Sequence, residues 1–526
     1  MYLSTVLICL FLSLSLPLCF SSPTSSSSTI PWMGHYTLDV NAKAQVILGI
    51  GYEIQSDSIG SGNEGLPDYL NTSVPYDLIP SEKKRFFSEM LTGFRFCRLA
   101  LGLYFRGTTS DGLNIIERFE GQADGLAEMA QESGIEGFEV EYWSPPPAWK
   151  SNQKYINGKL RSFDSVTLDD FSKAVVTDAL YLKNKGINPT WWGLQNEPPV
   201  GTNGDCIYSC CWYNSTEYYQ AFLATATAIR AALPDTIIHA SSESGQFYAP
   251  MILQDPKALE LVDAWTFHRV GANSDEQLSP NNFLKESYAR PVLNNEFEYL
   301  DENTSPERTI NTAQSIMNWM AFENSPSWYW LHALKPLTNA EARGYSLGFW
   351  APTNTSLGNF SIPPGTWKYN YDNYNAIAGF TNYLPWNSVR INVTEDEIRP
   401  DFRILAYLYD PTMARWKNKN KHQPSLVESA RRTLKEDTRA KAAVTKLAFV
   451  ITHRLNATVS PNFIYNITIV NMPLDVPLPV FKGHLFSFNT TDIDLGTRST
   501  SRDSMNGNIL LTVTIEPQTI QFWVEE

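Results

Sequence analysis

Eight short apolar runs, rich in β-branched and aromatic residues, recur between residues 46 and 331, and most are separated by segments of helical character. Eight strands alternating with helices predict an α/β fold, a (β/α)₈ TIM barrel over residues 46–384. A doubly wound open sheet is the alternative, but no glycine-rich phosphate loop follows any of the runs. The expected strands are Val46–Ile50, Phe94–Leu101, Gly137–Trp143, Thr190–Asn196, Thr236–Ala240, Ala264–His268, Val292–Glu296 and Ser327–Leu331.

The pattern changes after about residue 385, where strand-like runs follow one another without barrel helices between them. Such a succession predicts a C-terminal β-sandwich over residues 385–526. A segment rich in Lys, Arg and Glu, Arg415–Lys441, interrupts it and is expected to be an exposed insertion. The expected strands are Val389–Val393, Phe402–Leu408, Lys446–Thr452, Asn462–Val470, His484–Phe488, Ile509–Ile515 and Thr519–Val524.

The N-terminus has the pattern of a secretory signal peptide, an apolar run over residues 4–20 followed by a serine-rich stretch, with cleavage expected near Ser21 or Ser22. An uncleaved anchor helix is the alternative, which Pro17 and the short apolar span oppose. No later stretch is apolar enough to cross a bilayer, so no stable membrane insertion is expected after cleavage of residues 1–22. Nine Asn-x-Ser/Thr sequons further favour a secreted, extracellular glycoprotein: Asn71, Asn214, Asn303, Asn354, Asn359, Asn392, Asn456, Asn466 and Asn489.

Four cysteines remain after the signal segment, and three of them lie close together in the chain. In an oxidising compartment a disulfide is expected between Cys206 and either Cys210 or Cys211, whereas Cys97 is expected to be a buried thiol. A metal site at this cluster is disfavoured because no histidine is close in the sequence. The formal charge of −14 disfavours a nucleic-acid partner, since displacing counterions requires a basic surface.

Two glutamates end barrel strands about a hundred residues apart. Glu197 ends the fourth expected strand and Glu296 the seventh. In a closed barrel the carboxyl ends of all strands meet at one face, so the two side chains can face each other. A pair of carboxylates is what cleavage of a glycosidic bond requires, one to protonate the leaving oxygen and one to attack or to activate water. Glu298 is an alternative to Glu296, because residues two apart on a strand face the same way.

Other side chains at the strand ends are candidates for substrate binding. Arg98 could pair with and orient a carboxylate, or be a structural ion pair below the site. Asn196 could bind a sugar hydroxyl or cap a turn. His268 could bridge the two sides of the site or be a structural histidine. The remaining two, expected either to stack on a sugar ring or to pack in the core, are Trp143 and Trp330.

Several of these motifs together resemble glycoside hydrolase family 30. Gly49–Glu53 is similar to the family's glycine-rich start, Arg98 to its arginine on the second strand, and Trp143–Lys150 to its Ser-Pro-Pro-Ala-Trp motif. Gln195–Pro198 resembles the acid/base motif, which implies Glu197 as the proton donor, and Glu296-Phe297 resembles the nucleophile motif. The resemblance also implies a β-sandwich completed by an N-terminal segment. The strand expected within residues 31–45, where Tyr36, Leu38 and Val40 alternate with polar residues, would then join it.

The resemblance implies a retaining β-glycoside hydrolase with a carbohydrate substrate and no metal or organic cofactor. The substrate remains open, because activities in such families range over glucosyl lipids, β-1,6-glucan, xylan and galactan. Asn295 stands where the family usually has Thr or Ser, and Glu298 and the cysteine-rich loop after Glu197 are also departures. The alternative function is a catalytically inactive carbohydrate-binding protein on the same scaffold, which a covalent glycoside probe would distinguish from an enzyme.

Overall fold

The structure is a computed structural model, and it describes most of the chain outside the N-terminal segment and several loops. The predicted signal peptide and the charged segment Arg415–Lys441 lie outside the described residues. Among the described residues, no helix is both long and apolar enough to cross a membrane. The described ranges are 32–54, 78–102, 107–108, 115–117, 121–202, 204, 206, 208–243, 248–271, 273–275, 290–337, 342–353, 356, 358–411 and 445–526.

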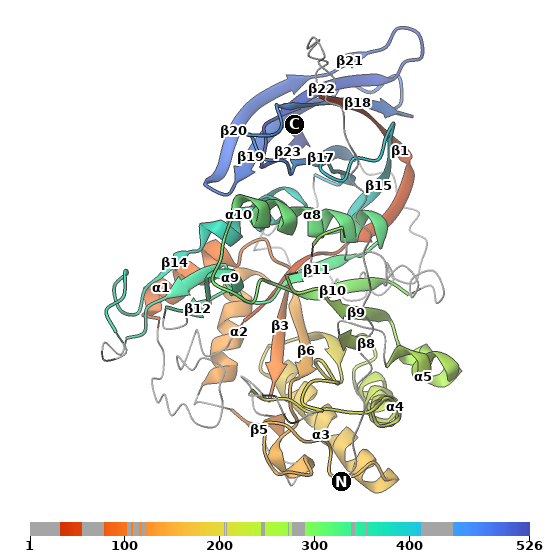
Figure 1. Cartoon of the computed structure of the whole chain (residues 1–526). Helices are drawn as coiled ribbons and strands as arrows, with labels where there is room; N and C mark the ends of the chain where they lie inside the picture. The colour runs from red at the N-terminus through yellow and green to blue at the C-terminus, as the bar shows by residue number, and fades with distance from the viewer. Residues whose placement is uncertain are drawn as a thin grey trace, which may run out of the picture.

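Eight parallel strands form a closed barrel in the lower half of the molecule (Figure 1). Their order is β2-β3-β6-β7-β8-β9-β10-β11, with β11 pairing back to β2. All eight expected strand positions contain a barrel strand, and the predicted TIM barrel is confirmed. The strands are β2 (Gly49–Glu53), β3 (Phe96–Leu101), β6 (Gly137–Tyr142), β7 (Pro189–Gly193), β8 (Ile237–Glu243), β9 (Ala264–His268), β10 (Val292–Phe297) and β11 (Ser327–Trp330).

Local capping explains where the barrel helices begin. Asp164 accepts hydrogen bonds from the backbone of Val166 and Thr167 at the start of α3, and Asn214 forms a reciprocal capping box with Glu217 at the start of α4. The helices are α1 (Pro80–Arg85), η2 (Phe86–Met90), α2 (Gln122–Ser133), η3 (Pro147–Trp149), α3 (Ser165–Asn184), α4 (Ser215–Ala232), α5 (Ala249–Gln254), α6 (Pro256–Leu261), α8 (Pro306–Phe322), α9 (Ala342–Tyr345) and α10 (Tyr371–Tyr383).

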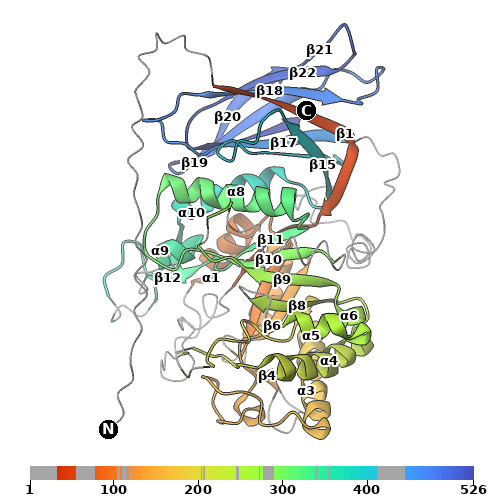
Figure 2. The ribbon, with the colours of Figure 1, turned by 45° about the vertical axis from the view of Figure 1, so that its right-hand side comes forward.

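A second, ten-stranded sheet curls around its own apolar core above the barrel (Figure 2). The N-terminal strand β1 (Met33–Ile47) lies inside this sheet, antiparallel to β15 and parallel to β18, so the predicted fold of barrel plus completed β-sandwich is confirmed. One exposed polar strand, β20, was not expected from the sequence. The other strands are β15 (Ser388–Glu395), β16 (Ile404–Tyr409), β17 (Lys446–His453), β18 (Phe463–Val470), β19 (Val480–Ser487), β20 (Thr490–Ser499), β21 (Ser501–Arg502), β22 (Ile509–Ile515) and β23 (Thr519–Glu525).

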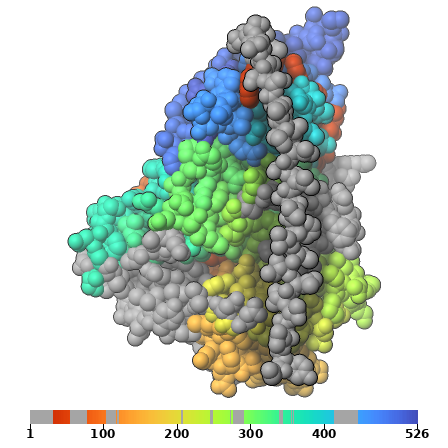
Figure 3. Space-filling view, in the orientation of Figure 1, coloured from red at the N-terminus to blue at the C-terminus, as the bar shows by residue number. Residues whose placement is uncertain are grey.

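Helices α8 and α10 lie between the barrel and this sheet (Figures 1 and 2), and α8 falls within the green band in Figure 3. The ring of Phe380 on α10 packs against Phe522 on β23 at 5.0 Å, and Gln314 on α8 donates a hydrogen bond to Thr452 on β17. The two halves therefore share a buried interface. Short strands complete the fold: β4 (Gly107–Thr108), β5 (Ile115–Ile116), β12 (Lys335–Pro336), β13 (Gly348–Trp350) and β14 (Trp367–Tyr369).

The first barrel strand begins three residues later than expected. The run Val46–Ile50 is divided, because β1 continues to Ile47 and β2 starts at Gly49. Gly49 has a φ of +143°, and a Cβ there would approach the side chains of Trp386 and Arg95 at about 3 Å. Glycine is what allows the chain to pass from one sheet to the other at this point. The shift places Glu53 at the carboxyl end of β2.

Candidate active site

The barrel interior is layered from apolar to charged. Its lower layer is a small apolar cluster, and the layers above it, towards the carboxyl ends of the strands, hold buried glutamates, histidines and one arginine. Charged side chains are rarely buried unless they are paired, so this concentration marks the carboxyl face as the candidate site. The apolar cluster consists of Leu48, Phe96, Trp191, Ile237, Ala264, Leu293 and Tyr329.

Glu197 lies four residues beyond the end of β7, in a turn that adjoining strands hold in place. Its backbone N–H donates to the carbonyl of Ser242, and that of Asn196 donates to Tyr142. Glu197 has a φ of +43°, a left-handed conformation that is uncommon for a residue with a side chain. Such strain persists only where neighbouring contacts enforce it, and it is frequent at active sites. The Glu197 side chain retains 25% exposure, which leaves it accessible to a ligand.

Glu296 lies across the mouth from Glu197, on a strand whose register slips. β10 pairs Asn294 with Phe267 and then Glu296 with His268, so an extra residue is accommodated between them. The slip lets both Asn295 and Glu296 make contacts inside the barrel, since Asn295 donates to Glu139 and Glu296 accepts from Arg98. One oxygen of Glu197, one oxygen of Glu296 and one nitrogen of His268 all lie within 4.8 Å of one another.

Arg98 is the central cation of the site. Its side chain is fully buried and forms ion pairs with Glu53 at 3.3 Å and Glu141 at 2.6 Å, with a further close contact to Glu296. It also donates to the side-chain oxygen of Asn196 at 2.6 Å. Burial would lower the pKa of Arg98, but the surrounding carboxylates raise it well above its ordinary value. Arg98 therefore remains charged and fixes the position of both the Glu296 carboxylate and the Asn196 amide.

His268 bridges the two candidate catalytic carboxylates. Its Nδ1 lies 3.0 Å from Glu197 Oε1 and 3.5 Å from Glu296 Oε2, and its Nε2 lies 3.3 Å from the hydroxyl of Ser242. Burial alone would lower the pKa of His268, but the charges of Glu296 and Glu197 raise it above its ordinary value. Burial raises the pKa of Glu197, but the hydrogen bond and charge of His268 outweigh it and lower that pKa. The titrations of Glu197 and His268 are therefore coupled.

Glu139 lies one layer below the mouth. It accepts a hydrogen bond from Asn295 at 2.8 Å, and its carboxylate lies 3.4 Å from His239 and 3.8 Å from Arg98. Burial raises the pKa of Glu139 to about 7, against a partial lowering by Arg98. Burial also lowers the pKa of His239 to about 4. This layer thus holds a neutral imidazole and a carboxyl group that ionises near neutral pH.

Glu139 is expected to make the protein less stable as pH rises. Because its folded pKa of about 7 lies above the ordinary 4.5, its contribution is complete below pH 4.5 and is lost as pH rises through 7. A shift of this size corresponds to roughly 3 kcal/mol. The free energy of unfolding, measured with urea, is expected to fall less steeply between pH 4.5 and 8 in Glu139→Gln than in the unchanged protein. The exposed Glu260→Gln is the control, and equal slopes for both variants would contradict this role for Glu139.

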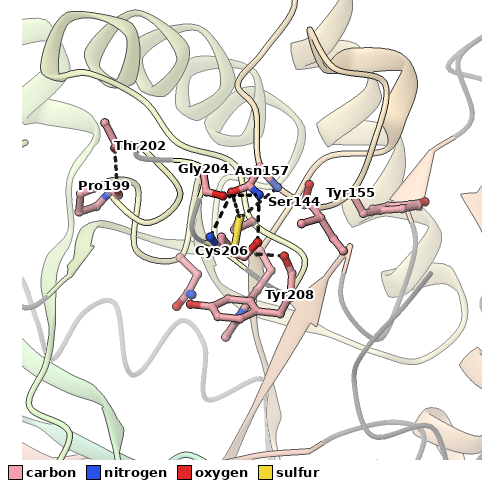
Figure 4. The surroundings of a disulfide bond; sticks show 12 residues. Ser144, Tyr155, Asn157, Pro199, Thr202, Gly204, Cys206 and Tyr208 are labelled. Atoms are coloured by element: carbon pink, nitrogen blue, oxygen red, sulfur yellow. Dashed lines mark hydrogen bonds between the residues drawn. A yellow bond between two sulfur atoms is a disulfide. The ribbon is translucent and has the colours of Figure 1, made fainter. Parts of the chain in front are cut away.

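The loop after Glu197 is closed by a disulfide between Cys206 and Cys210, one of the two pairings left open by the sequence (Figure 4). Cys97 and Cys211 are buried free cysteines. Asn157 anchors the loop, since its side chain donates to the carbonyls of Gly204 and Cys206.

The same loop brings Tyr208 into the site. The side chain of Tyr208 hydrogen-bonds to Glu197 and packs on Trp143, whose ring lies 4.4 Å from the Arg98 guanidinium. Trp143 is thus at the site, as expected. Sequence reasoning missed Tyr208, although its position between two neighbouring cysteines behind Glu197 was a usable signal.

One predicted position differs from the structure's arrangement. Trp330 is fully buried on the outer face of the barrel, where its ring packs on Phe297 and Trp328 and its indole N–H donates to the carbonyl of Tyr345. It cannot stack on a sugar from there, and its expected role is corrected to core packing. Glu298, the alternative to Glu296, lies beside His332, with its Oε2 at 3.9 Å from His332 Nε2. The structure therefore brings together Arg98, Trp143, Asn196, Glu197, His268 and Glu296, and adds Glu53, Glu139, Glu141, Tyr208 and Ser242, which the sequence had not indicated as site residues.

Glu197, His268 and Glu296 could also offer three ligand atoms to a divalent cation. Two features make the group a poor fit for one. The raised pKa of His268 favours its protonated form, which cannot ligate a metal, and Arg98 already places a positive charge against Glu296. The prediction that no metal is required stays a prediction.

No family model matches the chain, and no curated protein matches it in sequence. Its fold does match solved structures. A glycoside hydrolase family 30 subfamily 8 xylanase, Xyn30A from Clostridium acetobutylicum, is 12% identical, with a TM-score of 0.61 over 94% of this chain and 99% of that one. SrfJ from Salmonella typhimurium is 12% identical, with a TM-score of 0.63 over 93% and 92%. The endo-β1,6-glucanase BT3312 is 14% identical, with a TM-score of 0.58 over 93% and 94%. The chain therefore has the fold of glycoside hydrolase family 30, as the sequence motifs indicated.

Proposed function

We propose that the chain is a secreted, retaining β-glycoside hydrolase. The observation that carries the proposal is the pairing of Glu197 with Glu296, since one carboxylate oxygen of each lies within 4.8 Å of the other across the mouth of the barrel. Retaining glycosidases have carboxyl groups about 5–5.5 Å apart, whereas inverting ones need about 6.5–9.5 Å to admit a water. The predicted signal peptide and sequons support secretion.

In the first step, Glu296 attacks the anomeric carbon and forms a covalent bond to the sugar, while the bond from that carbon to the leaving oxygen breaks. Glu197 gives its proton to the leaving oxygen. In the second step, Glu197 takes a proton from water, and the water oxygen displaces Glu296 from the anomeric carbon. Configuration is retained because two inversions occur in sequence. Arg98 holds the Glu296 carboxylate in place for the attack.

His268 supplies the proton that the acid step requires. With a lowered pKa for Glu197 and a raised pKa for His268, their shared proton rests on the imidazole of the empty site. The hydrogen bond from Nδ1 to Glu197 provides a direct path for that proton when the leaving oxygen develops charge. Asn196, with its carbonyl oxygen engaged by Arg98, has its NH₂ group left to donate to a sugar hydroxyl.

A covalent glycoside probe tests the proposal. The protein is first screened against aryl β-glycosides, and the matching 2-deoxy-2-fluoro glycosyl fluoride is then added and the digest analysed by mass spectrometry. Labelling is expected on the peptide that contains Glu296, with loss of labelling in Glu296→Gln and no effect of a metal chelator.

Hydrolysis with inversion, seen by NMR of the first-formed sugar, would overturn the retaining mechanism. Sugar binding by calorimetry without any label or turnover would instead favour a carbohydrate-binding protein.

A further inference from the structure

Three polar side chains form a cluster beside Glu296, at the carboxyl ends of β2, β10 and β11. Glu53 ends β2, His332 follows β11, and Glu298 follows β10. His332 Nδ1 lies 3.5 Å from Glu53 Oε1, and His332 Nε2 lies 3.9 Å from Glu298 Oε2. The other oxygen of Glu53 accepts from Arg98, the same guanidinium that binds Glu296. Arg98 therefore links the cluster directly to the candidate nucleophile.

Three of the four atoms that face one another in this cluster lack hydrogen bonds. Among the residues that the structure describes, Glu53 Oε1, His332 Nδ1 and Glu298 Oε2 are buried and have no hydrogen-bond partner. The side chains are 1%, 9% and 3% exposed. Buried polar atoms are nearly always satisfied in folded proteins, and each exception is costly. Three such unpartnered atoms beside the Glu197–Glu296 pair indicate a place where a polar group of a ligand completes the hydrogen-bond network.

The charge states of the cluster define which polar group fits. Burial raises the pKa of Glu53 and of Glu298 well above the ordinary value, only partly offset by Arg98 at the first and by Lys335 at the second. Burial lowers the pKa of His332 well below its ordinary value. Glu53 and Glu298 thus hold a proton more readily than ordinary carboxyl groups and His332 less readily, so the cluster offers both donors and acceptors. A hydroxyl group, which donates one hydrogen bond and accepts two, complements them.

We propose that Glu53, His332 and Glu298 bind a hydroxyl of the sugar that becomes attached to Glu296, and that they select a neutral hexose as that sugar. The inference rests on the proposed function. The leaving oxygen lies at Glu197, so the retained ring extends from Glu296 towards β11 and β2, where the cluster lies. A uronic acid would have to bury its carboxylate beside Glu53 and Glu298 and is disfavoured, because the desolvation that raises the pKa of these two carboxyl groups would act on it as well.

A set of matched substrates tests the inference. The aryl β-hexoside cleaved best is compared with its 3-, 4- and 6-deoxy analogues, with the pentoside and with the uronide. For the unchanged protein, removal of one of these hydroxyls is expected to lower kcat/KM by about 10²-fold or more. Glu298→Leu and His332→Phe are expected to lower kcat/KM for the parent hexoside by a similar factor. For the one deoxy analogue that lacks the recognised hydroxyl, both substitutions are expected to change kcat/KM less than about threefold, because that analogue makes no hydrogen bond with the cluster.

The exposed Glu302→Gln, close to Glu298 in the chain, is the control and is expected to behave like the unchanged protein. Calorimetric binding of the methyl β-hexoside and its deoxy analogues to the Glu197→Gln variant gives a readout without turnover. Removing the recognised hydroxyl and substituting Glu298 or His332 in that variant are each expected to raise the dissociation constant, and the two changes together are expected to raise it no further. Equal losses on every substrate, which a structural role or a bound water would produce, overturn the inference while leaving the glycosidase intact. Preferred cleavage of a uronide or pentoside overturns it too. Absence of turnover, of covalent labelling and of binding overturns both proposals.

Discussion

Replacing Glu296 with glycine is expected to lower kcat on an aryl β-glycoside by on the order of 10⁵-fold, the scale seen when a nucleophile is removed. Sodium azide is expected to restore turnover and to yield the α-glycosyl azide. The vacated space lies on the face of the sugar where Glu296 attacks, so a small anion entering there inverts the configuration once. The product is identified by NMR, and the rate is followed by release of the aryl group.

Two companion variants make this result specific. Glu197→Ala with azide is expected to give the β-glycosyl azide, because the nucleophile is intact and azide replaces water in the second step. Its loss of rate is expected to be small for a dinitrophenyl leaving group, which departs without a proton, and large for an alkyl one. Glu298→Gly is expected to give no glycosyl azide. An α-azide from Glu298→Gly but not from Glu296→Gly would reverse the assignment of the nucleophile.

Replacing Arg98 with methionine is expected to reduce the free energy of unfolding by about 3–5 kcal/mol, the usual effect of breaking a buried ion pair. Four buried glutamates surround this guanidinium, and three would lose a partner within 3.3 Å: Glu53, Glu141 and Glu296. Activity is expected to fall by 10²-fold or more, since Glu296 and Asn196 would no longer be held in place. Urea unfolding and kcat/KM on the same preparation measure both effects.

The stability of the Arg98→Met variant is expected to depend steeply on pH. Without the cation, the buried carboxyl groups are expected to have folded pKa values above their unfolded ones, so their stabilisation is present at low pH and is lost as pH rises. The deficit relative to the unchanged protein should therefore be smaller at pH 5 than at pH 8. Arg95→Met is the matched control, since Arg95 is equally buried but pairs with Glu136. Arg95→Met is expected to destabilise the protein without the loss of activity expected for Arg98→Met. Equal losses of activity in the two variants would argue against a positioning role for Arg98.

The sequence supported the barrel because its signal is local and repeated. Each of the eight strands is an apolar run bounded by helix caps or turns, and every expected position contains a strand. The Glu197–Glu296 pairing also followed from sequence, since a closed barrel brings all its strand ends to one face. Those two inferences need only the order of elements.

The direction in which side chains point from the strands was harder to predict from the sequence. Trp143 ends one expected strand and Trp330 is the last residue but one of another, yet Trp143 lies over Arg98 and Trp330 packs outside the barrel. A one-residue change of register reverses the face on which a side chain lies, and the residues alone do not state the register. The slips in β8 and β10, which bring Ser242 and Asn295 into the site, have the same origin.

What the sequence by itself determined is the architecture and the pairing of Glu197 with Glu296, because strand periodicity and the positions of carboxylates at strand ends can be read from the residue types. Only the tertiary structure decided which groups surround the pair. It brought Glu53 to the mouth through the passage at Gly49, turned Glu298 towards His332, and carried Tyr208 to Glu197 on a disulfide-closed loop. These contacts join residues far apart in the chain, and their pKa values depend on burial, a property of the packed molecule that no single segment contains.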